Sequence, residues 1–213
     1  MQIALLLLAE YVIGSVPFGV IVGRAWRGVD VRKYGSGNIG ASNVLRVLGP
    51  GPAAVVFIGD ALKGYVPVAA GRALLVTWGV PHVELWLLAV CLAPIVGHSF
   101  SIFLRFTGGR AVTTTCGVLL ALALPVALIG LGVWVVVVAI TRYISVGSIV
   151  AAASVPICMA ASGKRWEWLV FWSAVALLVI LRHIPNIRRL MSGTETRIWE
   201  KVEVEGTTEA SEV

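Results

Sequence analysis

The sequence predicts an all-α polytopic membrane protein with seven transmembrane helices, an N-terminus outside the cell and a C-terminus in the cytoplasm. Composition is the first observation: 58% of the 213 residues are hydrophobic and 13% are charged, whereas a soluble domain carries about 25% charged residues. The second is a series of apolar runs that suit a bilayer core of about 30 Å. The third is an uneven distribution of basic residues among the polar segments between those runs.

Seven apolar segments are expected to form the helices. They cover residues 3–23, 52–76, 83–104, 112–124, 126–140, 144–161 and 166–181. The first base of the chain, Arg24, follows the first apolar run instead of preceding it. A removable signal peptide carries its positive charge on the other side, so this segment is expected to stay as a membrane span.

The stretch from Val112 to Ile140 decides the topology. It is long enough to be one helix, but Pro125 and three glycines favour a bent hairpin of two short helices. With a hairpin, 13 basic residues lie on the inner side and three lie outside, while Lys63 lies within a span. A single crossing would reverse every later segment and remove most of this positive-inside bias.

The excess of basic residues limits the kinds of ligand that the chain is expected to bind. Residues 1–194 contain 15 basic and five acidic residues, which suits anionic membrane lipids or phosphorylated small molecules. Nucleic acid is not expected, because the basic residues are scattered between long apolar runs. The three cysteines lack paired spacing, so neither a disulfide framework nor a metal site is indicated. Residues 1–201 are expected to form one membrane-embedded domain, followed by an acidic, disordered cytoplasmic tail at 202–213.

Three polar segments interrupt the apolar pattern, and the expected topology puts all three on the cytoplasmic side. The first, residues 30–46, contains Gly35, Gly37 and Gly40 in a G-x-G-x-x-G arrangement. No strand is expected before these glycines, which argues against a dinucleotide-binding fold. They can let backbone N–H groups converge on an anion, or they form an ordinary turn. Side chains that would assist anion binding are Ser36, Asn38, Ser42, Asn43 and Arg46.

The second polar segment, residues 97–115, places Gly108, Gly109 and Arg110 before small and hydroxyl residues that can begin a helix. This pattern is also typical of an anion-binding helix N-terminus. His98, at the start of the segment, fits a structural histidine as well as a functional one.

The third polar segment, residues 181–195, holds His183 and Asn186 on either side of a proline just past the last span. Its arginines fit a lipid-headgroup anchor, but a fixed turn at the membrane surface indicates a site. Two charges lie within a span, Asp60 and Lys63, which can form a structural ion pair or contact substrate.

Together the polar motifs resemble the bacterial acyl-phosphate-dependent glycerol-3-phosphate acyltransferase family, known as the PlsY family. The likeness runs from about Tyr11 to Arg197. It rests on SVPFG (15–19), DVRKYGSGNIGASN (30–43), DALKG (60–64), GHSFSIFLRFTGGRAV (97–112) and HIPNIRRLMSGTE (183–195).

The resemblance implies transfer of a fatty acyl group from acyl phosphate to the sn-1 hydroxyl of glycerol 3-phosphate, which gives lysophosphatidic acid and phosphate in the first step of phospholipid synthesis. Neither coenzyme A, acyl carrier protein nor a cofactor is implied. The fold implied is seven transmembrane helices in a bacterial inner membrane, with the site facing the cytoplasm. The proton of the attacking hydroxyl could pass to His183 or to a substrate phosphate, with the phosphate slightly favoured.

The motifs and the resemblance together predict the site residues. Those expected to be catalytic are Ser36, Arg110, His183 and Asn186. Those expected to bind substrate are Gly35, Gly37, Asn38, Gly40, Asn43, Arg46, Gly108 and Gly109. Arg110 departs from the family, where a Lys usually follows the two glycines, and the wider guanidinium alters the geometry of a phosphate contact.

The competing hypothesis is a transporter or channel for a phosphorylated metabolite, which the intramembrane pair Asp60 and Lys63 would also suit. Against it, the polar motifs collect on one side of the membrane and no inverted repeat is visible. A lipid-binding scaffold is the third interpretation.

Overall fold

The computed structural model describes residues 1–200, in which the regular elements are helices; the expected acidic tail at 202–213 lies outside the described residues. The elements are α1 (Gln2–Ser15), α2 (Phe18–Arg27), η1 (Val31–Lys33), α3 (Ala41–Leu48), α4 (Pro50–Thr77), α5 (Val83–Ser99), η2 (Ile102–Leu104), α6 (Val112–Leu122), α7 (Leu124–Thr141), α8 (Ile144–Ala161), α9 (Trp166–Arg182) and α10 (Ile184–Met191).

The predicted all-α membrane class is confirmed, although fewer helices than expected are of full membrane length. Four stretches of residues 1–200 are long and apolar enough to cross a bilayer: Gln2–Arg27, α4, α7 and α8. The pair α9 and α10, bent by 52°, makes a fifth if it counts as one span. Helices α5 and α6 are apolar but shorter, with 17 and 11 residues.

Three of the expected boundaries are corrected by the structure. The first span is broken at Pro17, which has no backbone N–H to continue the helical ladder. The third ends at Ser99 instead of 104, and the residues after it form η2 and a loop. The break in the 112–140 stretch falls at Ala123, so that Pro125 lies in the first turn of α7, where a proline costs no hydrogen bond.

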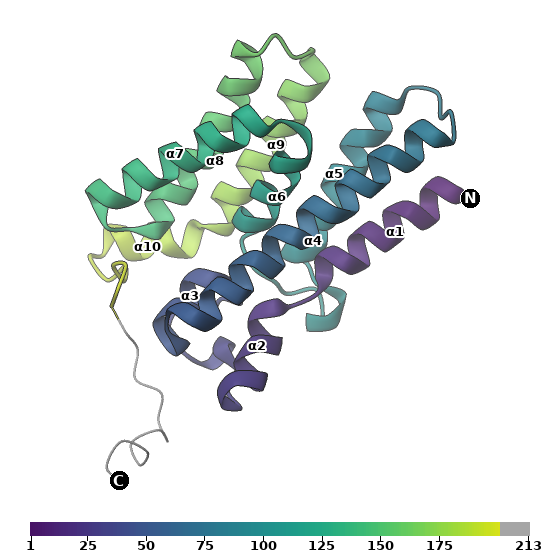
Figure 1. The fold of residues 1–213 in the computed structure, drawn as a ribbon. Coiled ribbons are helices and arrows are strands. Elements are labelled where there is room, and N and C mark those ends of the chain that lie inside the picture. Colours follow the sequence, from purple (N-terminus) through teal and green to yellow (C-terminus); the bar gives the residue numbers. More distant parts are fainter. Residues whose placement is uncertain (201–213) are drawn as a thin grey trace.

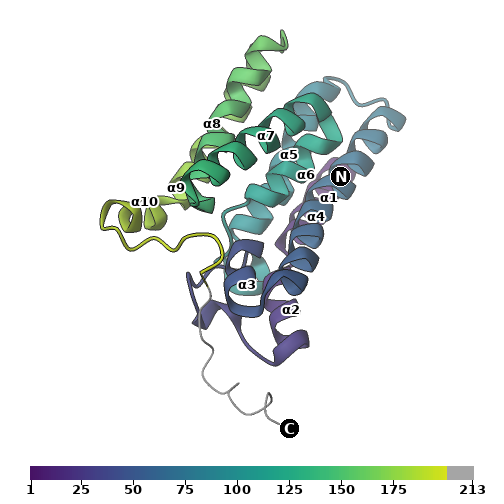
Figure 2. The same cartoon turned by 60° about the vertical axis from the view of Figure 1, so that its left-hand side comes forward.

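The chain reverses direction between α6 and α7, as the hairpin prediction requires (Figures 1 and 2). Both ends of the hairpin contact the same C-terminal part of the chain. The N–H of Ile198 donates to the carbonyl of Arg142 at the end of α7, at 2.8 Å. Arg182 donates to the carbonyls of Gly108 and Gly109, just before α6. The polar segments that flank the hairpin therefore lie at one end of the molecule.

The helices form two groups with α6 between them. One group contains α1, α4 and α5, and the other contains α7, α8 and α9 (Figure 1). Helix α4 packs most extensively on α6. Gly117 on α6 lies against the backbone of Ala61 so closely that a Cβ would overlap it, and small residues of this kind let membrane helices approach each other.

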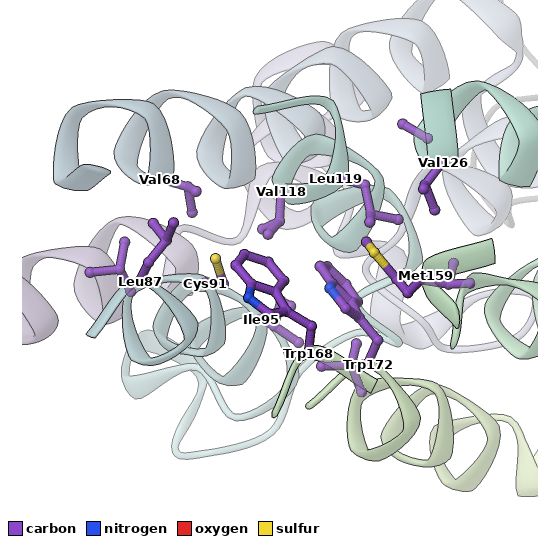
Figure 3. Packing of buried hydrophobic residues seen from close by; sticks show 14 of the residues in the cluster. Val68, Leu87, Cys91, Ile95, Val118, Leu119, Val126, Met159, Trp168 and Trp172 are labelled. Atoms are coloured by element: carbon purple, nitrogen blue, oxygen red, sulfur yellow. The ribbon is translucent and has the colours of Figure 1, made fainter. Parts of the chain in front are cut away.

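A buried apolar cluster joins the two groups. Trp168 and Trp172 of α9 and Met159 of α8 pack towards Val118 and Leu119 of α6 (Figure 3). A second, smaller cluster covers α2, η1, α3 and the start of α4, through residues such as Val31, Val44 and Val56. That second cluster supports the glycine-rich loop, because the loop lies between η1 and α3.

Candidate active site

The glycine-rich loop at residues 34–40 is held from within by Asn43, the third residue of α3. The Asn43 amide nitrogen donates to the carbonyls of Val31 (2.9 Å), Tyr34 (3.2 Å) and Asn38 (2.8 Å). Its Oδ1 accepts from the N–H (2.8 Å) and the hydroxyl (3.1 Å) of Ser36. These bonds use the donors and acceptor of a fully buried side chain. Asn43 was expected to bind substrate, but it is committed to shaping the loop.

The predicted glycines differ in how the loop uses them. Gly35 and Gly37 have φ values of 57° and 67°, in the left-handed region that glycine adopts without strain. Gly40 has an ordinary φ of −78° and donates its N–H to Oδ1 of Asn38 at 2.8 Å. Asn38 and Gly40 line the large cavity described below, so the last part of the loop and the start of α3 face it.

The second polar segment forms a short loop clamped from two sides. The N–H of Gly109 donates to the carbonyl of His98 at 3.0 Å. From the other side, the Arg182 guanidinium donates to the carbonyls of Gly108 (2.7 Å) and Gly109 (3.0 Å). Gly108 and Gly109 thus use their backbone groups to fix the loop, and the next residue, Arg110, faces the cavity.

Arg110 is not paired with any carboxylate of the described residues. Within residues 1–200 its guanidinium forms no ion pair or hydrogen bond. Burial lowers the pKa of Arg110 to about 10; the carboxylate of Glu195 opposes that shift, and nearby Arg189 and Arg46 add to it. The group stays protonated at neutral pH. A cation that faces a cavity without a partner is suited to bind an anion.

Arg46 is the second buried cation of the site. Its side chain is 5% exposed, and its Nη2 donates to the carbonyl of Thr196 at 3.0 Å. Within residues 1–200, no carboxylate lies at ion-pair distance from it. Burial lowers the pKa of Arg46 below its ordinary value, yet an arginine remains charged at neutral pH.

His183 and Asn186 are buried at the bend between α9 and α10. Nδ1 of His183 lies 2.8 Å from the carbonyl of Val179, and because a carbonyl only accepts, the neutral ring carries its proton there and keeps a lone pair on Nε2. His183 lines the cavity, whereas Asn186 does not. The Asn186 amide donates to Oε1 of Glu195 at 2.6 Å.

Glu195 ends the third polar segment, and no role was predicted for it from the sequence. Oε1 also accepts from the Ser145 hydroxyl (2.7 Å), and Oε2 accepts from Nε of Arg189 (2.7 Å). Burial alone would raise the pKa of Glu195, but hydrogen bonds from Asn186, Ser145 and Arg189 outweigh it and hold the pKa below its usual range. The carboxylate therefore joins α8, α10 and the C-terminal segment.

The intramembrane charges Asp60 and Lys63 form the expected ion pair. Nζ of Lys63 lies 2.8 Å from Oδ1 of Asp60, and both side chains are almost fully buried. Nδ1 of His98 lies 3.6 Å from the same Asp60 oxygen. Asp60 and His98 also line the cavity.

One cavity of about 540 Å³ connects these polar groups with the apolar interior. Its polar end contains Asn38, Asp60, His98, Arg110 and His183. The rest is apolar and lies between α4, α6, α7 and α8, with Phe57, Ile58, Leu119, Leu131, Trp134 and Val155 among its lining residues. A cavity with a cationic end and an apolar body can hold an amphiphile whose head is an anion.

The predicted site residues come together only in part. The structure places Asn38, Gly40, Arg110 and His183 on the cavity wall. The remaining ones do not line it: Gly35, Ser36, Gly37, Asn43, Arg46, Gly108, Gly109 and Asn186. Most of these others carry hydrogen bonds that hold the wall in place, as shown above for Asn43 and Asn186.

Comparison with known proteins gives consistent matches. A family model described as glycerol-3-phosphate acyltransferase matches residues 4–193. A glycerol-3-phosphate acyltransferase of Synechococcus sp. (strain JA-3-3Ab) is 45% identical over 194 residues, which cover 91% of this chain and 92% of that protein. Glycerol-3-phosphate acyltransferase 2 of Moorella thermoacetica is 48% identical over 198 residues, covering 92% and 98% of the two chains.

Two solved structures have a similar fold. One is the crystal structure of PlsY, an integral membrane glycerol 3-phosphate acyltransferase, in its glycerol 3-phosphate form, with a TM-score of 0.85 and 34% sequence identity. That match covers 92% of this chain and 96% of the other. The second is the lysophosphatidic acid form of PlsY, with a TM-score of 0.82, 34% identity and coverage of 92% and 95%.

The buried Glu195 carboxylate leads to a prediction about stability. Glu195→Ala should lower the free energy of unfolding by on the order of 2–4 kcal/mol, because Asn186, Ser145 and Arg189 lose their acceptor. Glu200→Ala, which removes an exposed acid five residues later, is the control and should change stability by less than about 0.5 kcal/mol. Thermal unfolding of the purified variants in detergent measures both.

Acid should reduce the difference between wild type and the Glu195→Ala variant. A carboxylate with a lowered folded-state pKa stabilises fully above its unfolded pKa, and this contribution is lost as the pH falls through the folded pKa. The two melting temperatures should therefore converge below about pH 4.5, the ordinary value for this group. A constant difference down to lower pH, or equal melting temperatures of the Glu195 and Glu200 variants, would contradict the assignment.

Proposed function

The chain belongs to the glycerol-3-phosphate acyltransferase family and is a membrane enzyme that produces lysophosphatidic acid, and we propose that its acyl donor is acyl phosphate. The sn-1 hydroxyl oxygen of glycerol 3-phosphate attacks the acyl carbonyl carbon. The bond from that carbon to the phosphate oxygen breaks, and inorganic phosphate leaves. Because the donor is already activated, the enzyme needs no covalent intermediate.

The observation that carries this proposal is the cavity with Arg110 at its polar end. Its two parts match the two parts of an acyl phosphate: a compact anion, and a chain that needs an apolar environment. Within residues 1–200 no carboxylate lies at ion-pair distance from Arg110, so its charge is available to a phosphate. The apolar wall from α4, α6, α7 and α8 would take the acyl chain.

Two anionic substrates must be held side by side, which requires several positive groups. We assign one phosphate to Arg110 and the other to Arg46 together with the N–H groups of Gly35, Asn38 and Ile39, which are those of the 35–40 loop that form no hydrogen bond within residues 1–200. Ser36 would act as part of that loop, since its hydroxyl is tied to Asn43. These roles are supported by the burial of Arg46, the partial burial of Arg110 and the absence of carboxylate partners for them among residues 1–200.

His183 would orient the attacking hydroxyl. With its proton on Nδ1, the ring offers the Nε2 lone pair to a hydroxyl hydrogen. We propose that the hydroxyl then turns its hydrogen from Nε2 to a phosphate oxygen of a substrate, which takes the proton as the new C–O bond forms, so that His183 stays neutral. Asn186 would hold this arrangement, because it lies in the first turn of α10 next to His183 and donates to Glu195 of the C-terminal segment.

The proposed topology has seven membrane helices, with the N-terminus outside and the site at the cytoplasmic face of a bacterial inner membrane. In this proposal the shorter helices α5 and α6 also enter the bilayer. Their apolar sequences support it, as does the packing of α5 along α1 of the Gln2–Arg27 stretch and of α6 along α4.

Donor choice provides the direct test of the reaction. Purified protein should form lysophosphatidic acid from acyl phosphate more than tenfold faster than from the acyl-CoA of the same chain, a difference of at least about 1.4 kcal/mol in the barrier. The reason is that acyl-CoA has no phosphate next to its carbonyl carbon for Arg110 to bind. Incorporation of labelled glycerol 3-phosphate measures the rate, with phosphate release without acceptor as the background. Rates within tenfold of each other would refute the proposed donor.

Cysteine accessibility tests the topology. In a variant without Cys91, Cys116 and Cys158, a cysteine at Pro125 should react with an impermeant reagent added outside the cell, because the tip of the α6–α7 hairpin faces outward. A cysteine at Ser192 should react only after the membrane is opened. Cysteine at Ser162, in the turn after α8, is the positive control for outside labelling. If positions 125 and 192 reacted from the same side, the shared cytoplasmic site would be excluded.

Substitution of Arg110 tests the phosphate contact. Arg110→Lys should keep most of the activity because the charge persists, whereas Arg110→Ala should lower kcat/KM by roughly tenfold or more, as expected for a charge-assisted hydrogen bond of about 1.5–3 kcal/mol. Arg27→Ala removes an exposed base of α2 and is the matched control, with unchanged kinetics. An Ala variant that folds, inserts and turns over like wild type means that Arg110 is only a topological anchor.

A further inference from the structure

The buried cluster of Asp60, Lys63 and His98 has no role in the reaction as proposed so far. Asp60 and Lys63 belong to α4 and His98 to α5, and the residues are 2%, 4% and 3% exposed. Removing charges from water is costly even when they are paired. Asp60 and Lys63 satisfy each other one helical turn apart, so a purely structural pair would not require the third member on another helix.

His98 connects this cluster to the loop that precedes Arg110. Its carbonyl accepts the N–H of Gly109 at 3.0 Å. Its ring lies directly against Gly109, so closely that a Cβ on that glycine would overlap Nε2. The opposite nitrogen, Nδ1, points to Oδ1 of Asp60 at 3.6 Å. The imidazole ring thus lies between the Asp60 carboxylate, which its Nδ1 faces without a hydrogen bond, and the Gly109 backbone, which it contacts.

Asp60 is itself held in place. Lys63 binds it at 2.8 Å and also donates to the carbonyl of Val16 at 2.7 Å, at the break between α1 and α2. These contacts connect the cluster to three helices, α1, α4 and α5. A ring anchored in this way is a rigid surface for the Gly109 backbone.

Within residues 1–200 no hydrogen bond or ion pair holds the Arg110 side chain. The direction of the Arg110 side chain therefore follows from the backbone before it. Arg182 holds that backbone by donating to the carbonyls of Gly108 and Gly109. After it, Ala111 has a left-handed φ of 59°, a conformation that a non-glycine residue keeps only when its surroundings impose it.

We propose that Asp60, Lys63 and His98 form a positioning cluster that aims Arg110 at the phosphate of the substrate. His98 is the residue that transmits this constraint, through the Gly109 backbone. The inference rests on the proposed role of Arg110 as a phosphate ligand and adds the residues that place it there.

The decisive variant is His98→Leu, which keeps the bulk of the side chain and loses the contact with Asp60. The ion pair between Asp60 and Lys63 survives in it, so folding should be retained. We expect kcat/KM to fall about tenfold. The loss should appear in the same constant, kcat or KM, that changes in Arg110→Ala. His98→Asn, whose amide can donate to Asp60 from near the position of Nδ1, should recover part of the loss.

A double variant separates positioning from direct contact, because His98 also lines the cavity. If His98 acts only through Arg110, the pair His98→Leu and Arg110→Ala should be within twofold of Arg110→Ala alone. If the losses in kcat/KM of the two single variants multiply in the double variant, His98 contacts the substrate independently of Arg110. That result would overturn the proposal. Kinetics of His98→Leu within twofold of wild type would also overturn it.

Glu10→Gln provides the matched control. Glu10 is a buried carboxyl of α1 that packs against Gly71, away from the Gly108–Gly109 loop, so its substitution should leave kcat and KM unchanged. The same loss in this variant would indicate a general effect of buried polar groups and would refute positioning. If the Leu variant cannot be recovered, His98→Gln, which also lacks a group at Nδ1, decides by the same criteria.

The outcome also separates this inference from the proposed function. Wild-type kinetics in Arg110→Ala would remove the phosphate contact and the positioning cluster together. Impaired Arg110→Ala beside unaffected His98→Leu would leave the phosphate contact standing and refute only the cluster.

Discussion

The structure depends on keeping several cations buried without neutralising them. Arg46 donates to the carbonyl of Thr196 and Arg182 to those of Gly108 and Gly109, while Arg110 forms no hydrogen bond or ion pair within residues 1–200. A neutral carbonyl satisfies part of the hydrogen-bonding need of a cation but does not cancel its charge. A bundle that paired each of these cations with a carboxylate would be easier to stabilise. Its site would then have little positive electrostatic potential to attract a phosphate.

The carbonyls come from places where the helices are interrupted. A regular helix uses its carbonyls internally, and only its last four are free. Val16 ends α1 at the break before Pro17, while Gly108 and Gly109 precede α6. The breaks in the helical pattern are therefore the source of acceptors for buried cations. In a bilayer, where water cannot satisfy such groups, irregular backbone is tolerated only where protein covers it or a cavity lies beside it.

The carboxylates of Glu195 and Asp60 have a structural role that differs from the role of the cations. Glu195 accepts from Ser145, Asn186 and Arg189 and so ties the C-terminal segment to α8 and α10. Asp60 pairs with Lys63 and faces His98, whose ring contacts the Gly108–Gly109 loop. Each acid thus holds part of the framework, while Arg110 and Arg46 stay free of acidic partners among residues 1–200. This division lets one small protein be stable and still present positive charge at the end of an apolar cavity.

The helical membrane class can be predicted from the amino-acid sequence, as can the break in the 112–140 stretch to within two residues and the polar segments that supply Arg110 and His183. These predictions follow from apolar run length, proline chemistry and motif order, which are properties of neighbouring residues. Three features become visible only in the folded chain: Asn43 hydrogen-bonds within the loop, Glu195 joins three elements, and His98 of α5 meets Asp60 of α4. Which partner a polar side chain finds depends on how distant segments pack, and a buried polar group must take the partner that packing brings within reach.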